Sequence, residues 1–235
     1  MKRTFIAALL LTPAAAMADY SAEAELGATL ISGNTDSTNI LAKYNSKHKL
    51  GDWSNSYKLE ALYSEDDGER AAEKYLAEAQ TDYPAEGKHY FFAALGGEVD
   101  KFSGYDYQVN AAAGYGQRII QQDTMTLKAE IGPGYTYKKV DEDVSPNADD
   151  ESDAMMRVFG EFWWQFSDNA EFKQVLRSDV AFDGATITKS ETSVAANLIG
   201  ELAMKLSYNV DHNSDPVAGT DSTDTILAAT LLYKF

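Results

Sequence analysis

Apolar and polar residues alternate with a period of two along most of this chain, and this pattern constrains the fold more than any other feature. In residues 20–31, YSAEAELGATLI, the apolar positions run from Tyr20 to Leu30 in steps of two. The closing residues, TDTILAATLLYKF, repeat the pattern up to Phe235. Because a period of two places alternate side chains on opposite faces of a β-strand, the chain is predicted to be all-β.

Twelve segments of this kind are present, and each is predicted to be a strand. They span residues 20–31, 38–50, 53–64, 72–83, 89–100, 107–119, 125–138, 155–165, 171–182, 188–198, 202–211 and 223–235. Helical spacing competes only around residues 72–83, where Ala and Glu favour a helix. Tyr75 and Tyr83 lie in phase with the small residues between them, which favours a strand there as well.

The breaks between these segments alternate in character. Long acidic or Gly-rich breaks such as SGNTDS and KVDEDVSPNADDESD take turns with short ones such as GD and QQD. Long loops at one end and tight turns at the other are typical of bacterial outer-membrane barrels. The predicted fold is therefore a transmembrane antiparallel up-and-down β-barrel of about 12 strands, with both termini periplasmic.

The outward aromatic residues fall into two groups on this topology. The periplasmic group is Tyr20, Trp53, Tyr83, Tyr115, Trp164, Tyr233 and Phe235, and the external group is Tyr63, Tyr75, Tyr107, Tyr135, Tyr137, Phe182 and Tyr208. Two aromatic girdles around an apolar band are expected at the two membrane interfaces. A soluble β-sandwich, the architectural alternative, does not predict such clustering at two ends.

The first residues have the three parts of a secretory signal peptide. Lys2 and Arg3 precede an apolar run over residues 5–11, and Ala16-Met17-Ala18 supplies a small-x-small cleavage site. The apolar run is too short for a transmembrane helix. We therefore expect residues 1–18 to be removed and residues 19–235 to form a single outer-membrane β-barrel domain, located in the cell outer membrane.

Composition excludes several other classes of protein. The chain carries 37 acidic against 20 basic residues, and so large an acidic excess argues against a nucleic-acid partner. There are no cysteines, so disulfides and thiolate sites are absent. The mean hydropathy of −0.37 is compatible with a membrane barrel, because only alternate residues need to be apolar.

Several short patterns resemble known proteins. The final aromatic residues, Tyr233 and Phe235, resemble the signature by which the bacterial barrel-assembly machinery recognises its clients. A strand leading into Gly33-Asn34-Thr35-Asp36, a following strand up to Trp53 and the closing segment resemble the salt-induced outer-membrane proteins, the YdiY-like family. The resemblance spans the chain after residue 18. It implies an outer-membrane barrel in contact with outer-membrane lipid, assembled by that machinery and linked to salt or osmotic stress, and it supplies no functional residues.

Charged residues out of phase with the apolar face are predicted to face the interior. The candidate lumen-lining residues are Lys58, Glu60, Lys74, Glu78, Arg118, Lys128, Glu130, Arg157, Glu161, Arg177 and Asp179. Many lie two or four positions apart on one strand, as in Lys58/Glu60, Lys74/Glu78, Lys128/Glu130, Arg157/Glu161, Arg177/Asp179 and Lys189/Glu191. They either pair and fill the lumen or line a narrow aqueous path. Strand number does not decide between these, since twelve falls between filled eight-stranded barrels and open barrels of 16–18 strands.

One external break is especially acidic. It contains Asp141, Glu142, Asp143, Asp149, Asp150, Glu151 and Asp153. Clustered carboxylates suit Ca²⁺ or Mg²⁺, but the EF-hand spacing and its glycine are absent. A solvated acidic loop that raises the local cation concentration is the preferred interpretation.

Catalysis is not predicted. Of the three histidines, only His212 stands next to a carboxylate, Asp211, that could orient it as a base. No serine joins them in a recognised motif, and no cofactor or metal site is predicted. The expected function is a narrow pore for passive passage of ions or small polar solutes. The alternative is a structural or stress-associated barrel with a filled lumen that acts through its acidic external loops, and the oligomeric state stays open.

Overall fold

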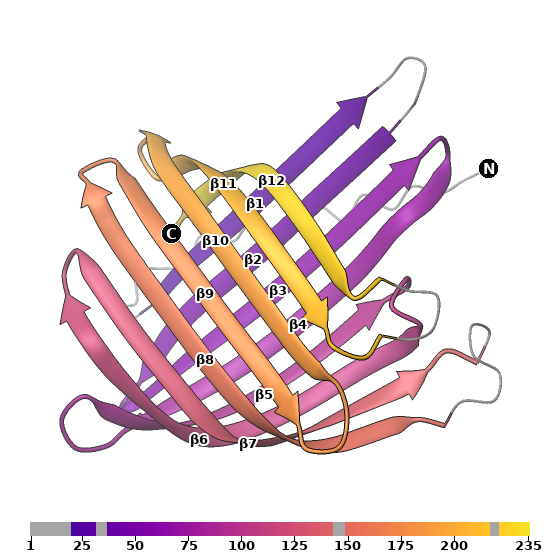
Figure 1. Cartoon of the computed structure of the whole chain (residues 1–235). Coiled ribbons are helices and arrows are strands. Elements are labelled where there is room, and N and C mark those ends of the chain that lie inside the picture. Colours follow the sequence, from indigo (N-terminus) through magenta and orange to yellow (C-terminus); the bar gives the residue numbers. More distant parts are fainter. Residues whose placement is uncertain (1–19, 32–36, 143–148, 217–220) are drawn as a thin grey trace.

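The computed structural model describes residues 20–31, 37–142, 149–216 and 221–235. These residues form twelve strands (Figure 1). Their bounds are β1 Tyr20–Ile31, β2 Ser37–Leu50, β3 Trp53–Asp66, β4 Glu69–Pro84, β5 His89–Asp100, β6 Tyr105–Gln122, β7 Met125–Val140, β8 Glu151–Ser167, β9 Ala170–Ala181, β10 Thr186–Ile199, β11 Leu202–Asn213 and β12 Thr223–Lys234. The described residues contain no helix that is long and apolar enough to cross a membrane.

The strands form a closed antiparallel barrel, in which each strand pairs with the next and β1 pairs with β12. The predicted fold class is therefore confirmed, including a strand rather than a helix over residues 72–83. Tyr20 and Phe235 lie at one end of the barrel, which we call the terminal end. The opposite end, where β7 connects to β8 and β11 to β12, is the loop end. The signal-peptide prediction for residues 1–18 lies outside the described residues.

Alternation separates the two faces of the barrel wall. On β1 the outward Leu26 has an exposed fraction of 60 %, and the neighbouring inward Glu25 has one of 4 %. The same inversion recurs around the barrel, with apolar residues exposed on the outside and charged residues buried inside. This arrangement is opposite to that of a soluble domain and matches a wall with hydrocarbon on its outer face.

The strands at the loop end extend farther than predicted, which corrects two assignments. β8 begins at Glu151, so Glu151 and Asp153 are strand residues rather than members of an acidic loop. Glu151 pairs directly with Lys138 of β7, and their side chains form an ion pair at 2.9 Å. This cross-strand pair stabilises the extension of the hairpin, a contribution that sequence spacing does not reveal.

The backbones of β6 and β7 approach each other closely around Gly114. The strands pair at Ala112↔Gly134 and again, in the same register, at Tyr115↔Ile131, and the residues between these pairs form no ladder pair. A Cβ atom added to Gly114 would lie 2.2 Å from the Ile131 carbonyl oxygen and 2.5 Å from the Gly132 Cα atom. Only glycine permits two backbones to approach so closely.

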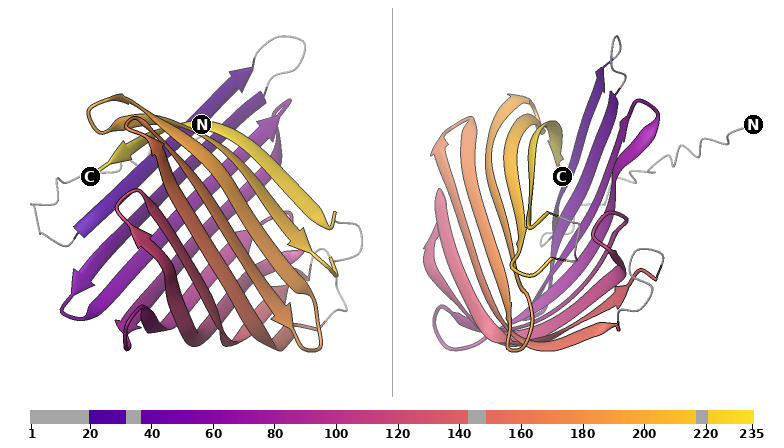
Figure 2. Two further views of the ribbon diagram at one scale, coloured as in Figure 1. Left: turned by 60° about the vertical axis from the view of Figure 1, so that its left-hand side comes forward. Right: turned by 45° about the vertical axis from the view of Figure 1, so that its right-hand side comes forward.

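The seam between β1 and β12 is paired over a short distance only. Pairing runs from Glu23↔Lys234 to Leu26↔Leu231, although β1 continues to Ile31 and pairs with β2 along its whole length. Figures 1 and 2 show the yellow strand β12 beside the indigo strand β1 near the C-terminus, then bending away from it toward the loop end. The wall is thus joined at the terminal half of the seam and open at the loop half.

Cysteine pairs test this seam. We expect oxidation to cross-link Leu26→Cys with Leu231→Cys efficiently, because directly opposite residues bring their Cβ atoms near disulfide distance. Ala28→Cys with Ala229→Cys, one step farther along the same outward face, should remain largely reduced. The natural chain contains no cysteine, so the fraction of disulfide-linked protein on non-reducing gels reports only the distance between the two introduced cysteines. Equal yields for the two pairs would show that the ladder continues toward the loop end.

Candidate functional site: the charged barrel interior

Inward charged side chains meet across the interior from strands that are not neighbours in the sheet. Lys47 of β2 lies 3.9 Å from Glu161 of β8, although these strands stand on opposite sides of the barrel. Lys74 of β4 reaches Asp211 of β11 at 2.6 Å. Such contacts require both side chains to point into the barrel and the facing walls to lie within the combined reach of two side chains.

The first cluster, which we call the seam cluster, joins β1, β2, β10 and β11. Lys205 binds Glu25 at 2.9 Å and Glu191 at 2.6 Å. Glu191 also binds Lys43 at 3.2 Å, and Thr230 of β12 donates to Glu25 at 2.8 Å. The carboxylate of Glu25 is almost fully buried, so its charge depends on these two donors.

The second cluster, which we call the loop-end cluster, bridges β4 and β5 to β10 and β11. Lys74 lies 3.3 Å from Glu98, 3.8 Å from Asp100 and 2.6 Å from Asp211. Lys189 binds the same Glu98 and lies 3.5 Å from Asp211. Two cations and three carboxylates therefore alternate across the lumen, with one negative charge in excess.

The third group lies on β4, β6, β8 and β9. Arg177 binds Glu78 on the facing wall and lies 3.4 Å from Asp179 on its own strand. Asp179 in turn accepts from Arg157 at 2.7 and 2.9 Å. The Arg157 Nη2 atom, which donates to Asp179, also donates to the side-chain oxygen of Asn110 of β6 at 2.7 Å. The fork of one arginine thus holds three strands together.

Aromatic and polar side chains narrow the interior toward the terminal end. Tyr90 is fully buried and donates to Glu130 at 2.7 Å. Gln80 donates to the same carboxylate at 3.0 Å, and the Arg118 guanidinium lies 4.4 Å from the centre of the Tyr90 ring. Arg118 also lies 3.9 Å from Asp82. Together these side chains leave only narrow spaces at this level of the barrel.

The buried polar side chains of the interior have hydrogen-bond partners. Among the described residues, no buried side-chain nitrogen or oxygen lacks a hydrogen-bond partner. Fixed charges of both signs therefore follow one another along the barrel, with Phe92 and Met155 filling space beside them. Chemically, the arrangement is a network of paired charges in which each buried polar atom already has a protein partner.

Sequence spacing identified some of these pairs and missed others. Three of the same-face pairs in the sequence also bind each other: Lys58–Glu60 at 3.4 Å, Lys128–Glu130 at 3.4 Å and Arg177–Asp179 at 3.4 Å. In Lys74/Glu78, Arg157/Glu161 and Lys189/Glu191, all six residues instead bind partners on other strands. For the first two of these pairs, residues four apart on a strand are separated by about 13 Å, so a partner on another strand is nearer.

Asp211 is an interior residue that is not among the predicted lumen-lining residues. It ends the predicted strand 202–211, with His212 beyond that strand, but both residues belong to β11. Asp211 points inward to Lys74, whereas the His212 Nδ1 atom pairs with the Thr223 hydroxyl at 2.8 Å. Adjacent strand residues face opposite sides, so this carboxylate does not orient this imidazole. Ser207, Asn209 and Asp211 are alternate residues of one strand, so the inward phase of the first two would have indicated that Asp211 also points inward.

The predicted acidic loop is partly ordered by hydrogen bonds. Asp150 accepts from the Tyr137 hydroxyl at 2.6 Å and from the Val140 amide at 3.1 Å. These donors hold the pKa of the Asp150 carboxyl below its usual range. Glu142 and Asp149 are exposed, Asp141 adjoins the end of β7, and Asp143 lies outside the described residues. In the described part of the chain, no three acidic or histidine side chains converge as a metal site would require.

The chain end closes the seam. The Phe235 amide donates to the Ala22 carbonyl at 2.8 Å, and the Tyr233 and Phe235 rings pack edge to face at 4.9 Å. Both rings remain exposed on the outer face. Their role as an assembly signal stays a prediction.

Comparison with known proteins finds a sequence relative and solved barrels of similar fold. The uncharacterized protein YdiY of Escherichia coli strain K12 is 28% identical over 228 residues, which cover 94% of this chain and 86% of that protein. The translocator domain of the autotransporter NalP from Neisseria meningitidis has a TM-score of 0.52 at 11% identity, covering 92% of this chain and 88% of that one. The COG4313 outer membrane channel from Pseudomonas putida F1 has a TM-score of 0.51 at 10% identity, covering 92% and 94%. At such identities the two structures show the fold alone.

The sequence comparison also settles the family. The YdiY-like resemblance seen in the turn and strand patterns is confirmed by the identity to YdiY. The family model described as "Protein of unknown function, DUF481" matches residues 24–235, nearly the whole of the barrel. The chain therefore belongs to the DUF481 family.

Proposed function

We propose that the protein is an outer-membrane barrel that passes small ions along a narrow path through its charged interior, with the terminal end in the periplasm. The observation that carries this proposal is the sequence of cations and anions that crosses the lumen from the loop-end cluster to Lys47 and Glu161. Rings of charged side chains select ions by their charge in known channels. The description of the COG4313 protein as an outer membrane channel supports the same class of function.

The loop end is expected to favour cations. Asp224 stands opposite Asp211 in the ladder between β11 and β12, and the loop-end cluster already carries one excess negative charge. Acidic side chains at a narrow entrance raise the local concentration of cations. A preference for small cations over anions therefore follows from the distribution of charge rather than from a dedicated binding site.

A filled barrel is the second candidate. Tyr90, Phe92 and Met155 are closely packed in the interior, and the buried polar atoms of the described residues are satisfied. Such a lumen would carry no current, and the protein would act through its loops. The role in salt or osmotic stress implied by the family resemblance is compatible with either candidate and stays a prediction.

Conductance in planar bilayers distinguishes the two. We expect the wild-type protein to give small, discrete, cation-selective steps. Removing both partners of one bridge, in Lys74→Ala/Asp211→Ala, should raise the conductance about twofold or more, since a pair of side chains that crosses the lumen is then removed. The matched control is Lys139→Ala/Asp106→Ala, which removes an exposed pair at 3.1 Å and should leave the steps unchanged.

Heat-modifiable mobility must first show that each protein is a folded barrel, and the conductance results then distinguish the ion path from the filled barrel. A silent wild type with a conducting double variant would overturn the ion path and support the filled barrel. Anion-selective steps would contradict the expected effect of the loop-end carboxylates. Steps of equal size in all three proteins would show that the loop-end cluster is not the constriction.

A further inference from the structure

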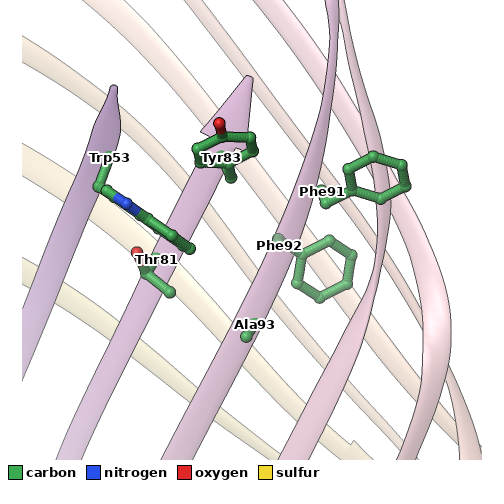
Figure 3. Close-up of a pocket in the computed structure, with 6 residues that line it drawn as sticks. All are labelled: Trp53, Thr81, Tyr83, Phe91, Phe92 and Ala93. Atoms are coloured by element: carbon green, nitrogen blue, oxygen red, sulfur yellow. The ribbon is translucent and has the colours of Figure 1, made fainter. Parts of the chain in front are cut away.

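An apolar groove crosses the outer face of β3, β4 and β5 at the terminal end. It has a volume of about 360 Å³ and is lined by Trp53, Thr81, Tyr83, Phe91, Phe92 and Ala93. All but Phe92 are outward positions, in phase with exposed residues of their strands. In Figure 3 the indole of Trp53 extends from β3 toward Thr81 and Tyr83 of β4, and Phe91 and Phe92 come from β5.

The register of the three strands shapes this groove. Tyr83 stands opposite Phe91, and two residues farther from the terminal end Thr81 stands opposite Ala93. Large rings therefore surround the entrance and small side chains form the stretch behind them. The Trp53 and Tyr83 rings lie 4.8 Å apart at 52°, so one wall of the groove is already packed.

Two hydrogen-bond donors at the groove have no protein acceptor. Neither the Trp53 indole N–H nor the Tyr83 hydroxyl is hydrogen-bonded to any other described residue. Two other outward tyrosines at this end are partnered: Tyr20 bonds Tyr44 at 2.5 Å, and Tyr115 bonds His89. Buried or interfacial Tyr and Trp groups normally find an acceptor at their polar tip.

The geometry points to a preferred site for one phospholipid, with an acyl chain in the groove and its ester or phosphate oxygens accepting from Trp53 and Tyr83. The apolar lining suits hydrocarbon and excludes ions and sugars. The position within the aromatic girdle of the terminal end places the donors at headgroup depth. This inference rests on the proposed placement in the outer membrane and does not depend on ion conduction.

Tryptophan fluorescence provides the test, because the chain has only three tryptophans. Trp163→Phe/Trp164→Phe leaves Trp53 as the reporter. Trp53→Phe/Trp163→Phe leaves Trp164, which is similarly exposed in the same girdle and packs against Phe166 at 5.6 Å. Both barrels are reconstituted in vesicles of unlabelled phosphatidylethanolamine that contain a small fraction of phosphatidylethanolamine with brominated chains, which quench nearby indoles.

We expect quenching of Trp164 to follow the mole fraction of brominated lipid, and quenching of Trp53 to exceed it by several fold at low mole fraction. Tyr83→Phe in the Trp53 reporter removes one donor and keeps the ring, and should weaken the preference up to about tenfold. Ala93→Phe should fill the groove and bring Trp53 quenching down to the Trp164 level.

Three results would overturn the site. Equal quenching of Trp53 and Trp164 would show ordinary lipid contact. An unchanged preference in Ala93→Phe would place the lipid elsewhere. An unchanged preference in Tyr83→Phe would show that the Tyr83 hydroxyl donates no hydrogen bond to a lipid oxygen. Each barrel is checked by heat-modifiable mobility and by conductance, so failure of the lipid site is distinguishable from failure of membrane insertion or of the ion path.

Discussion

Replacement of Gly114 by alanine is expected to prevent β6 and β7 from pairing where their backbones approach most closely, and so to prevent the barrel from closing. The new Cβ atom would lie 2.2 Å from the Ile131 carbonyl oxygen and 2.5 Å from the Gly132 Cα atom. Both obstacles are backbone atoms of the neighbouring strand, so no rotamer change relieves the contact. We expect a loss of stability beyond the ~1–3 kcal/mol typical of an overpacked core, because strand pairing itself must break.

Gly160→Ala is the matched control on β8. The nearest atom to a Cβ there is the Lys128 carbonyl oxygen at 3.9 Å, an ordinary contact. Refolding into detergent or lipid vesicles, followed by heat-modifiable mobility and urea titration, measures both variants. Gly160→Ala should fold like the wild type and Gly114→Ala should remain in the unfolded band. Equal urea midpoints for the two variants would contradict the close approach of the two backbones.

Replacement of Lys205 by methionine is expected to destabilise the seam cluster. Lys205 is the cation shared by Glu25 and Glu191. Without it, Glu25 would keep only the Thr230 hydroxyl as a hydrogen-bonding partner in the cluster. Removing one partner of a buried ion pair typically costs ~3–5 kcal/mol, since the remaining charge stays buried without compensation.

Two further variants test whether the loss of stability in Lys205→Met comes from the unpaired charge of Glu25. Glu25→Gln/Lys205→Met removes both charges and should recover a large part of the loss, because the amide can still accept from Thr230. Lys139→Met removes the cation of a pair exposed to solvent and should change stability by less than ~1 kcal/mol. Urea midpoints of the refolded barrels report all three. A loss in Lys205→Met no larger than that in Lys139→Met would show that the lumen is wet enough to solvate Glu25.

The strands themselves could be predicted because their information is local. Along β1 and β11 the hydrophobic period specifies both the element and the face of each side chain. The competing helical spacing over residues 72–83 resolved to a strand for the same reason, since Tyr75 and Tyr83 had to remain on one face. The ends of β8 and β11 were less predictable, because polar residues such as Glu151 and His212 continue a ladder after the apolar signal has ended.

The sequence by itself determined the all-β barrel, the number of strands and the division into an apolar outer face and a charged inner one. Only the tertiary structure decided that Lys74 binds Asp211 rather than Glu78 and that Gly114 lies against the backbone of β7. It also decided that the β1–β12 seam is paired over part of its length, and that Trp53, Tyr83 and Phe91 line a groove. The physical reason is that a period of two specifies a face but not a partner. Partners depend on strand tilt, register and the curvature of the closed wall, which arise from all twelve strands together.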